Sequence, residues 1–231
     1  MKRYAADGVH ERVIECVASL PSRGDAFDVP TGQGALAKDL EDLGFRVFPA
    51  DLARDNIVYR NGRCVQININ NPLPLKDEVM DCVVCVEGIE HAENPVFVIR
   101  EMARVLRPGG HIVITTPNVM SINSRVRFLL YSHLEYFRYF GPLPPDAKHR
   151  ITGFDHAHLT PVSYPQMRYM LEKYGLAIQR VEVNRKVKKW HVIHPLLKLV
   201  IRHKASRRYT DCFYLSDTLL EGEILVFVAR K

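Results

Sequence analysis

The chain has 231 residues, of which 47% are hydrophobic and 25% are charged, and its net charge is +6. This length can bury the core of one α/β domain with an insertion, whereas two independent domains would be short of residues. The sequence contains no apolar run of about eighteen residues, and no apolar signal region follows Met1–Ala5. We therefore expect one domain over residues 1–231, in a cytoplasmic protein without a membrane span.

The cysteines do not have the pattern of a disulfide framework. There are five of them, an odd number, spread over several predicted core elements. Cys82 and Cys85 are spaced like a redox pair, but positions i and i+3 of a strand point to opposite faces. Buried strand cysteines are the better interpretation.

A βαβ unit follows an expected N-terminal helix over Val9–Leu20. Within Asp25–Leu52, a short apolar run leads into a turn with Gly32 and Gly34, then into a helical pattern and a second apolar run that ends at Asp51. Such a unit binds an adenosine or a dinucleotide at the carboxyl edge of a parallel sheet. The glycines let the backbone approach a ligand closely, and Asp51 can accept hydrogen bonds from both ribose hydroxyls.

Two classes of cofactor use this unit. Gly32, Gly34 and Ala37 fit the dinucleotide pattern G-x-G-x-x-A, which alone is a weak signal. Asp28 argues against a dinucleotide, because a carboxylate at the strand end would repel a pyrophosphate and attract an ammonium group.

The segment Asp28–Gly34, DVPTGQG, resembles the first motif of the class I S-adenosylmethionine-dependent methyltransferases, D-x-G-x-G-x-G. It departs from that motif at Pro30, which fixes φ and lacks a donor where the family has its first glycine. EGIEHAENP, from Glu87, and LRPGGHIVITTPN, from Leu106, are similar to the family's fourth and fifth motifs. Because two further motifs match in the right order, we do not attribute the resemblance to chance.

The resemblance implies a Rossmann-like, doubly wound, mostly parallel sheet of seven strands, with an aromatic-rich cap inserted after the fifth strand. It also implies S-adenosylmethionine as the cofactor and no metal. The residues that it places around the cofactor are Asp28, Gly32, Gly34, Asp51, Asn68 and Glu87.

The middle of the chain supplies further strands. Cys64–Ile69 alternates like a third strand. Asn68 at its end has two interpretations that we weigh evenly, an acceptor for the adenine amino group or a turn former. Met80–Val86 is nearly continuously apolar, as in a central strand buried on both faces. A helix over Val96–Leu106, a turn at Arg107–Gly110 and a fifth strand follow.

Residues 118–160 interrupt the pattern. This segment holds several aromatic residues and a proline-rich turn, after which a helix over Val162–Tyr174 and a strand over Leu176–Val183 resume. Family members commonly place substrate-recognition elements at this point, so we expect a substrate-side insertion. The alternative is a satellite hydrophobic cluster that only caps the domain.

Residues 185–210 form a second insertion, basic and apolar, before a final strand over Glu223–Ala229. Its predicted helix has a broad apolar face, with Lys198 and Arg202 opposite. We favour packing of this face on the sheet or on a second subunit. The alternative is peripheral contact of residues 188–208 with the inner face of an anionic membrane.

The chemistry expected from the resemblance is in-line transfer of a methyl group, which needs a base when the acceptor is a hydroxyl or a protonated amine. His158 and His156 are the catalytic candidates, and His158 ranks first because the family often has a histidine near that place. We expect a small-molecule, surface-glycan or lipid-linked acceptor and no specific nucleic acid. Alternatives are an NAD(P)-dependent oxidoreductase of Rossmann type and a catalytically silent module that binds an adenosyl cofactor.

Overall fold

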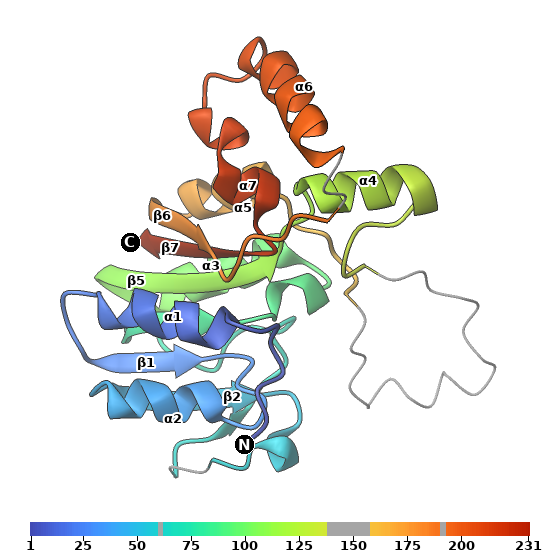
Figure 1. The fold of residues 1–231 in the computed structure, drawn as a ribbon. Helices are drawn as coiled ribbons and strands as arrows, with labels where there is room; N and C mark the ends of the chain where they lie inside the picture. Colours follow the sequence, from blue (N-terminus) through green and yellow to red (C-terminus); the bar gives the residue numbers. More distant parts are fainter. Residues whose placement is uncertain (60–61, 138–157, 190–192) are drawn as a thin grey trace.

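The structure is a computed structural model that describes residues 1–59, 62–137, 158–189 and 193–231. It contains a seven-stranded sheet with helices on both faces (Figure 1). The described strands lie in the order β3-β2-β1-β4-β5-β7-β6; β7 pairs antiparallel with β5 and β6, and the other pairs are parallel. This is the doubly wound, mostly parallel sheet that the sequence predicts. The strands are β1 (Asp25–Asp28), β2 (Arg46–Asp51), β3 (Val65–Gln66), β4 (Met80–Cys85), β5 (Leu106–Pro117), β6 (Ala177–Val183) and β7 (Ile224–Arg230).

The helices bury the two faces of the sheet in separate apolar clusters. The N-terminal pair, α1 and α2, packs on one face, and α3 and α5 pack on the other. Cys82 belongs to the first cluster and Cys85 to the second, so the two thiols point to opposite faces as expected. The helices are α1 (Val9–Ala18), α2 (Ala35–Asp42), α3 (Pro95–Val105), α4 (Ile122–Tyr131), α5 (Tyr164–Lys173), α6 (His194–Ser206) and α7 (Asp217–Glu221), with 3-10 turns η1 (Arg54–Asn56), η2 (Ile89–His91) and η4 (Cys212–Leu215).

Three boundaries differ from the sequence prediction. β3 is only two residues long because it pairs with the last two residues of β2 alone. The expected turn at Arg107–Gly110 lies within β5, which starts directly after α3 and shifts register against β4. The helix after the insertion begins at Tyr164, because the Ser163 side chain and Gln166 form a capping box there.

An arm of the chain, residues 184–223, leaves the sheet after β6 and returns at β7. It carries α6, η4 and α7, and α6 stands beyond the β6 edge, beside α4 (Figure 1). The two ends of the arm are hydrogen-bonded together: the Ile224 N–H donates to Asn184 Oδ1 at 3.0 Å, and the Glu223 N–H donates to the Arg185 carbonyl at 3.1 Å. Among the described residues, no helix has the length and apolarity that crossing a bilayer requires.

The apolar face of α6 does not pack on the sheet. Of this helix only His194 is buried, and Leu196 and Leu199 are exposed. Lys198 and Arg202 instead turn inward to acidic residues of α7. The expected packing on the sheet is therefore wrong, while packing on a second subunit, the other half of the favoured interpretation, stays a prediction.

Candidate cofactor and acceptor site

The glycine turn after β1 is fixed to the end of β2 by a carboxylate. Asp51 Oδ2 accepts a hydrogen bond from the Gly32 N–H at 2.8 Å, and Oδ1 accepts one from the Ala53 N–H at 3.1 Å. Gly32 and Gly34 have φ values of +57° and +84°, which glycine adopts without strain. Burial raises the pKa of Asp51, and its backbone donors oppose that rise. The carboxylate keeps further lone pairs for hydroxyl donors, so its position suits the predicted ribose contact.

Asp28 is fully buried at the end of β1, next to this turn. Its Oδ2 accepts a hydrogen bond from Thr31 Oγ1, while no donor among the described residues reaches Oδ1. Burial raises the pKa of this carboxyl to about 7. A buried carboxylate with one free oxygen is the group that an ammonium would complete, as expected at the methionine end of the cofactor.

The ring of Pro30 has room because the fourth-motif segment has a glycine, Gly88, where it contacts the ring. A Cβ built on Gly88 would lie 2.3 Å from Pro30 Cδ, so the proline ring occupies the space that a side chain there would need. The Val29–Pro30 peptide bond is cis. The departure from the family motif is therefore accommodated by contact between two motif segments.

Two tyrosines lie against the glycine turn. The ring of Tyr4 would be 3.1 Å from a Cβ on Gly32, and the Cβ of Tyr59 would be 2.7 Å from one on Gly34. The Tyr59 N–H also donates to the Gln33 carbonyl at 3.0 Å. Any side chain at these glycines would displace the tyrosines.

Asn68 forms a turn in this structure. Its Oδ1 accepts a hydrogen bond from the Asn70 N–H at 2.9 Å, and its carbonyl accepts one from the Asn71 N–H at 3.0 Å. The turn-forming alternative is thus present, and the adenine contact stays a prediction.

Glu87 starts the loop after β4 with a left-handed backbone, φ +48°. Thr115 Oγ1 donates to its Oε1 at 3.1 Å and accepts from its N–H at 2.8 Å, which holds the carboxyl against β5. Burial raises the pKa of Glu87 to about 7, against the effect of the Thr115 hydrogen bond.

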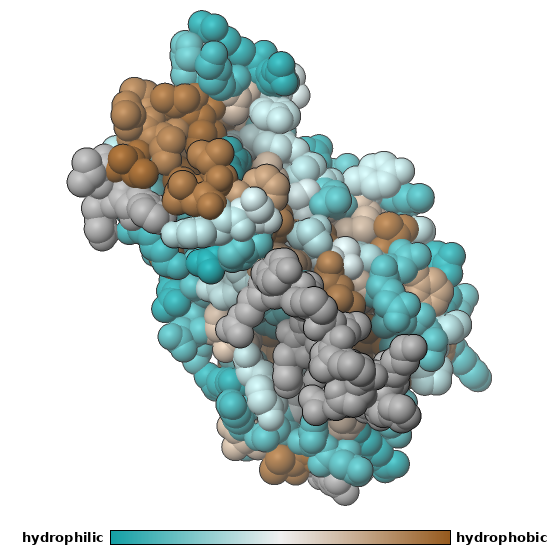
Figure 2. Space-filling view, turned by 90° about the vertical axis from the view of Figure 1, so that its right-hand side faces the viewer, coloured by the Kyte–Doolittle hydropathy of each residue, from teal (hydrophilic) through white to brown (hydrophobic). Residues whose placement is uncertain are grey.

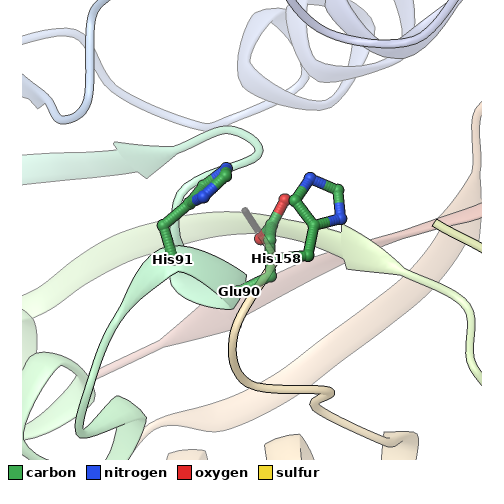
Figure 3. Close-up of side chains that lie close together, drawn as sticks. All are labelled: Glu90, His91 and His158. Carbon is green, nitrogen blue, oxygen red and sulfur yellow. The ribbon is translucent and has the colours of Figure 1, made fainter. Parts of the chain in front are cut away.

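Glu90, His91 and His158 lie together beside this loop (Figure 3). The rings of His91 and His158 meet edge to face with centroids 4.8 Å apart, and Phe137 packs on His158 at 5.5 Å. Glu90 is fully buried, and neither carboxyl oxygen has a hydrogen-bond donor in the described part of the chain. Burial, then the charge of Glu87, raises the pKa of Glu90 well above its usual range.

His158 reaches this cluster through backbone pairing. The N–H groups of Leu159 and Thr160 both donate to the Glu90 carbonyl at 3.0 Å, and Thr160 Oγ1 donates to the Ala92 carbonyl at 2.8 Å. This extended segment precedes α5, so His158 lies six residues before the first helical residue rather than at the head of the helix. His156, the other catalytic candidate, lies outside the described residues.

The cluster has side-chain atoms that can coordinate a divalent cation. One atom each from Glu90, His91 and His158 lie within 4.8 Å of one another, and one carboxylate with two imidazoles suits a transition metal. The prediction that no metal is used is not tested by this geometry.

The sequence analysis missed Glu90 as a functional candidate. The signal was the spacing Glu87-x-x-Glu90-His91 directly after a buried strand, which puts two carboxyls and an imidazole on one short loop. Of the predicted residues, Asp28, Gly32, Gly34 and Asp51 surround the glycine turn. Glu87 and His158 lie in and beside the loop after β4.

The part of the chain that forms this edge of the sheet matches a known protein family. A model described as "Methyltransferase domain" matches residues 27–114, which run from β1 through most of β5. Over these residues the chain is similar to a methyltransferase domain. This similarity and the fold imply S-adenosylmethionine as the cofactor, and the free oxygen of Asp28 and the position of Asp51 fit that group.

Relatives of the methyltransferase domain are distant. A probable S-adenosylmethionine-dependent methyltransferase of Mycolicibacterium smegmatis is 31% identical over 113 residues, 47% of this chain and 44% of that protein. A ubiquinone biosynthesis O-methyltransferase of Aliivibrio fischeri is 29% identical over 101 residues, 40% of this chain and 43% of that protein. The matches thus span less than half the length of these curated relatives.

Structural similarity to solved proteins covers more of the chain than sequence similarity does. A S-adenosylmethionine-dependent methyltransferase from Archaeoglobus fulgidus superposes with a TM-score of 0.61 at 17% identity, covering 96% of this chain and 93% of that one. At this identity the similarity establishes the fold only. The similarity of fold therefore extends well beyond the residues that match in sequence.

Proposed function

We propose that the chain transfers a methyl group from S-adenosylmethionine to a hydroxyl group of an acceptor bound beside His158. The observation that carries the proposal is the proximity of two sites at one sheet edge. The glycine turn with Asp28 and Asp51 suits the cofactor, and the cluster of Glu90, His91 and His158 follows the neighbouring strand.

When bound, the cofactor supplies an electrophilic methyl carbon on a sulfonium. The chain's own residues then have to hold the acceptor oxygen in line with that carbon, at about 3 Å, since positioning accounts for much of such a reaction. Asp51 orients the ribose end and Asp28 binds the ammonium of the methionine end. The new bond forms between the acceptor oxygen and the methyl carbon, and the carbon–sulfur bond breaks.

A hydroxyl acceptor must lose its proton during the transfer. His158 accepts this proton in our proposal. The buried carboxyl of Glu90, whose pKa is raised, lies within 4.8 Å of His158. Phe137 gives the acceptor an apolar wall against the His158 ring. The name of the Aliivibrio fischeri relative, an O-methyltransferase, agrees with a hydroxyl acceptor.

Two measurements test the proposal. Thermal stabilisation by S-adenosylhomocysteine, and not by NAD(P), is expected of the purified chain, and labelled S-adenosylmethionine should methylate members of a panel of phenolic and lipid-linked hydroxyls. His158→Gln should lower kcat at least tenfold and leave the affinity for S-adenosylhomocysteine unchanged. Cofactor binding with no transfer to any acceptor would instead indicate a silent binding module, and an unchanged kcat would remove His158 from the reaction.

A further inference from the structure

Two helices expose apolar side chains on the same side of the molecule. Leu129 of α4 is 81% exposed, and Leu196 and Leu199 of α6 are 63% and 66% exposed. Figure 2 shows one broad hydrophobic area at the upper end of this side, with hydrophilic surface around it. We call this area the α4/α6 face; its exposed apolar residues are Phe128, Leu129, Leu130, Tyr131, Ile193, Leu196, Leu199 and Val200.

Helix α6 packs a mixed side against the protein, where Leu197 and Ile201 are half-buried, and exposes other apolar residues. Its charged side faces the protein: Lys198 Nζ lies 2.5 Å from Asp217 Oδ1 and 2.6 Å from Glu221 Oε1. Arg202 donates to Asp217 at 2.7 Å and to the Leu215 carbonyl at 3.0 Å. These ion pairs hold one side of the helix to the protein and leave Leu196 and Leu199 in solvent. An apolar face held outward in this way marks a binding surface.

The two chain segments that carry the face are basic and contain no acidic residue. The sequence has no Asp or Glu between Glu182 and Asp211 or between Asn118 and Leu134, while residues 183–210 contain nine Lys or Arg. Lys204, Arg207 and Arg208 are exposed and form no ion pair within the described part of the chain. The charge of this end therefore complements an anionic partner.

A hollow of about 250 Å³ lies beside the C-terminal end of α4. Arg127, His133 and Lys189 line it, together with Glu135, which pairs with Lys189. Phe137 forms part of the same wall and packs on His158, with ring centroids 5.5 Å apart. An anionic headgroup here would lie next to Phe137, the ring that packs on the proposed base.

We propose that the α4/α6 face docks on the surface of an anionic lipid bilayer. The leucines and aromatic rings would enter the acyl boundary, and Lys204, Arg207 and Arg208 would lie at headgroup level. A second copy of the chain is a poorer occupant, because a symmetric pairing of this face would bring these cations together without acids to balance them. Docking brings the hollow and His158 to a lipid-linked acceptor, a consequence that rests on the proposed function.

Vesicle sedimentation tests the docking without any methyl transfer. The chain should sediment with vesicles of phosphatidylcholine and phosphatidylglycerol at low salt, weakly with phosphatidylcholine alone, and less as salt screens the charges. Replacing Lys204, Arg207 and Arg208 by glutamine should weaken binding about a hundredfold, from roughly fivefold for each cation. Leu129→Gln with Leu199→Gln should abolish binding even at low salt.

A matched variant controls for net charge. Replacing three exposed cations away from the face, Lys76, Arg100 and Lys173, by glutamine should leave vesicle binding unchanged. All variants should keep the affinity for S-adenosylhomocysteine, which separates docking from the cofactor site. Absence of binding to anionic vesicles at low salt, equal losses in the two triple variants, or concentration-dependent dimerisation that the leucine variants abolish would overturn the proposal.

Discussion

The Gly32 N–H donates to Asp51 Oδ2 at 2.8 Å. This bond joins the glycine turn to the end of the neighbouring strand before any ligand is bound. The turn is therefore preorganised, and the carboxylate serves both the protein backbone and the expected ribose.

The first prediction concerns Asp51. Asp51→Ala removes hydrogen bonds to both ribose hydroxyls, and because a hydrogen bond to a charged group contributes about 1.5 to 3 kcal/mol, we expect at least a tenfold loss in affinity for S-adenosylhomocysteine. Calorimetry measures this, and Asp55→Ala, an exposed carboxylate four residues away, is the control. Equal affinities for wild type and Asp51→Ala would place the ribose elsewhere.

The second prediction follows from the buried Asp28. Its pKa is about 7 in the folded state, above the value of about 3.9 in an unfolded chain, so the native state holds the proton more tightly. Its contribution to stability is complete below pH 4 and is lost as the pH rises to 7. The free energy of unfolding of Asp28→Asn, relative to wild type, should therefore increase over this interval, by about 4 kcal/mol at most.

Denaturant unfolding of both proteins at several pH values measures that difference. The affinity of wild type for S-adenosylhomocysteine should also rise between pH 6 and 7, because the ammonium needs the ionised carboxylate, and Asp28→Asn should lose this dependence. A constant difference in stability across the interval would show that Asp28 titrates normally.

The third prediction concerns the contact between Pro30 and Gly88. Gly88→Ala places a Cβ 2.3 Å from Pro30 Cδ, and overpacking of this kind costs about 1 to 3 kcal/mol. Replacing Pro30 by glycine in the same chain removes the ring and should recover part of the lost stability. Thermal unfolding of the two single variants and the double variant gives the coupling free energy between the two positions. If the stability changes of the single variants simply add up in the double variant, the contact is contradicted.

The fourth prediction tests whether Glu90 acts as an uncharged carboxyl or as a metal ligand. Because burial raises the pKa of this carboxyl, an uncharged amide suits the site, and Glu90→Gln should fold with an unchanged melting temperature and lose activity. Wild-type activity should persist in EDTA. Stabilisation of wild type, but not of Glu90→Gln, by manganese or zinc would instead assign the three side chains to a metal site.

The sheet was predictable because its strands are buried on both faces and its turns carry glycine. Asp51 and the turn followed from one βαβ pattern. The partnership of Glu90 with His158 was not predictable, since it depends on pairing of residues 159 and 160 with the Glu90 carbonyl across almost seventy residues. The exposure of Leu196 and Leu199 on α6 also escaped prediction: an apolar stripe normally packs inward, but here Lys198 pairs with Asp217 and Glu221 on the inner side of the helix.

The arm of residues 184–223 departs from the sheet and rejoins it at a single place, where Asn184 and Arg185 bond to residues 223 and 224. The antiparallel last strand makes this possible, because β6 and β7 are neighbours and need only a hairpin between them. Helix α6, in which only His194 is buried, can therefore lengthen or shorten without altering the strands that carry the cofactor residues, whereas Leu219 of the same arm packs in the core and has to stay.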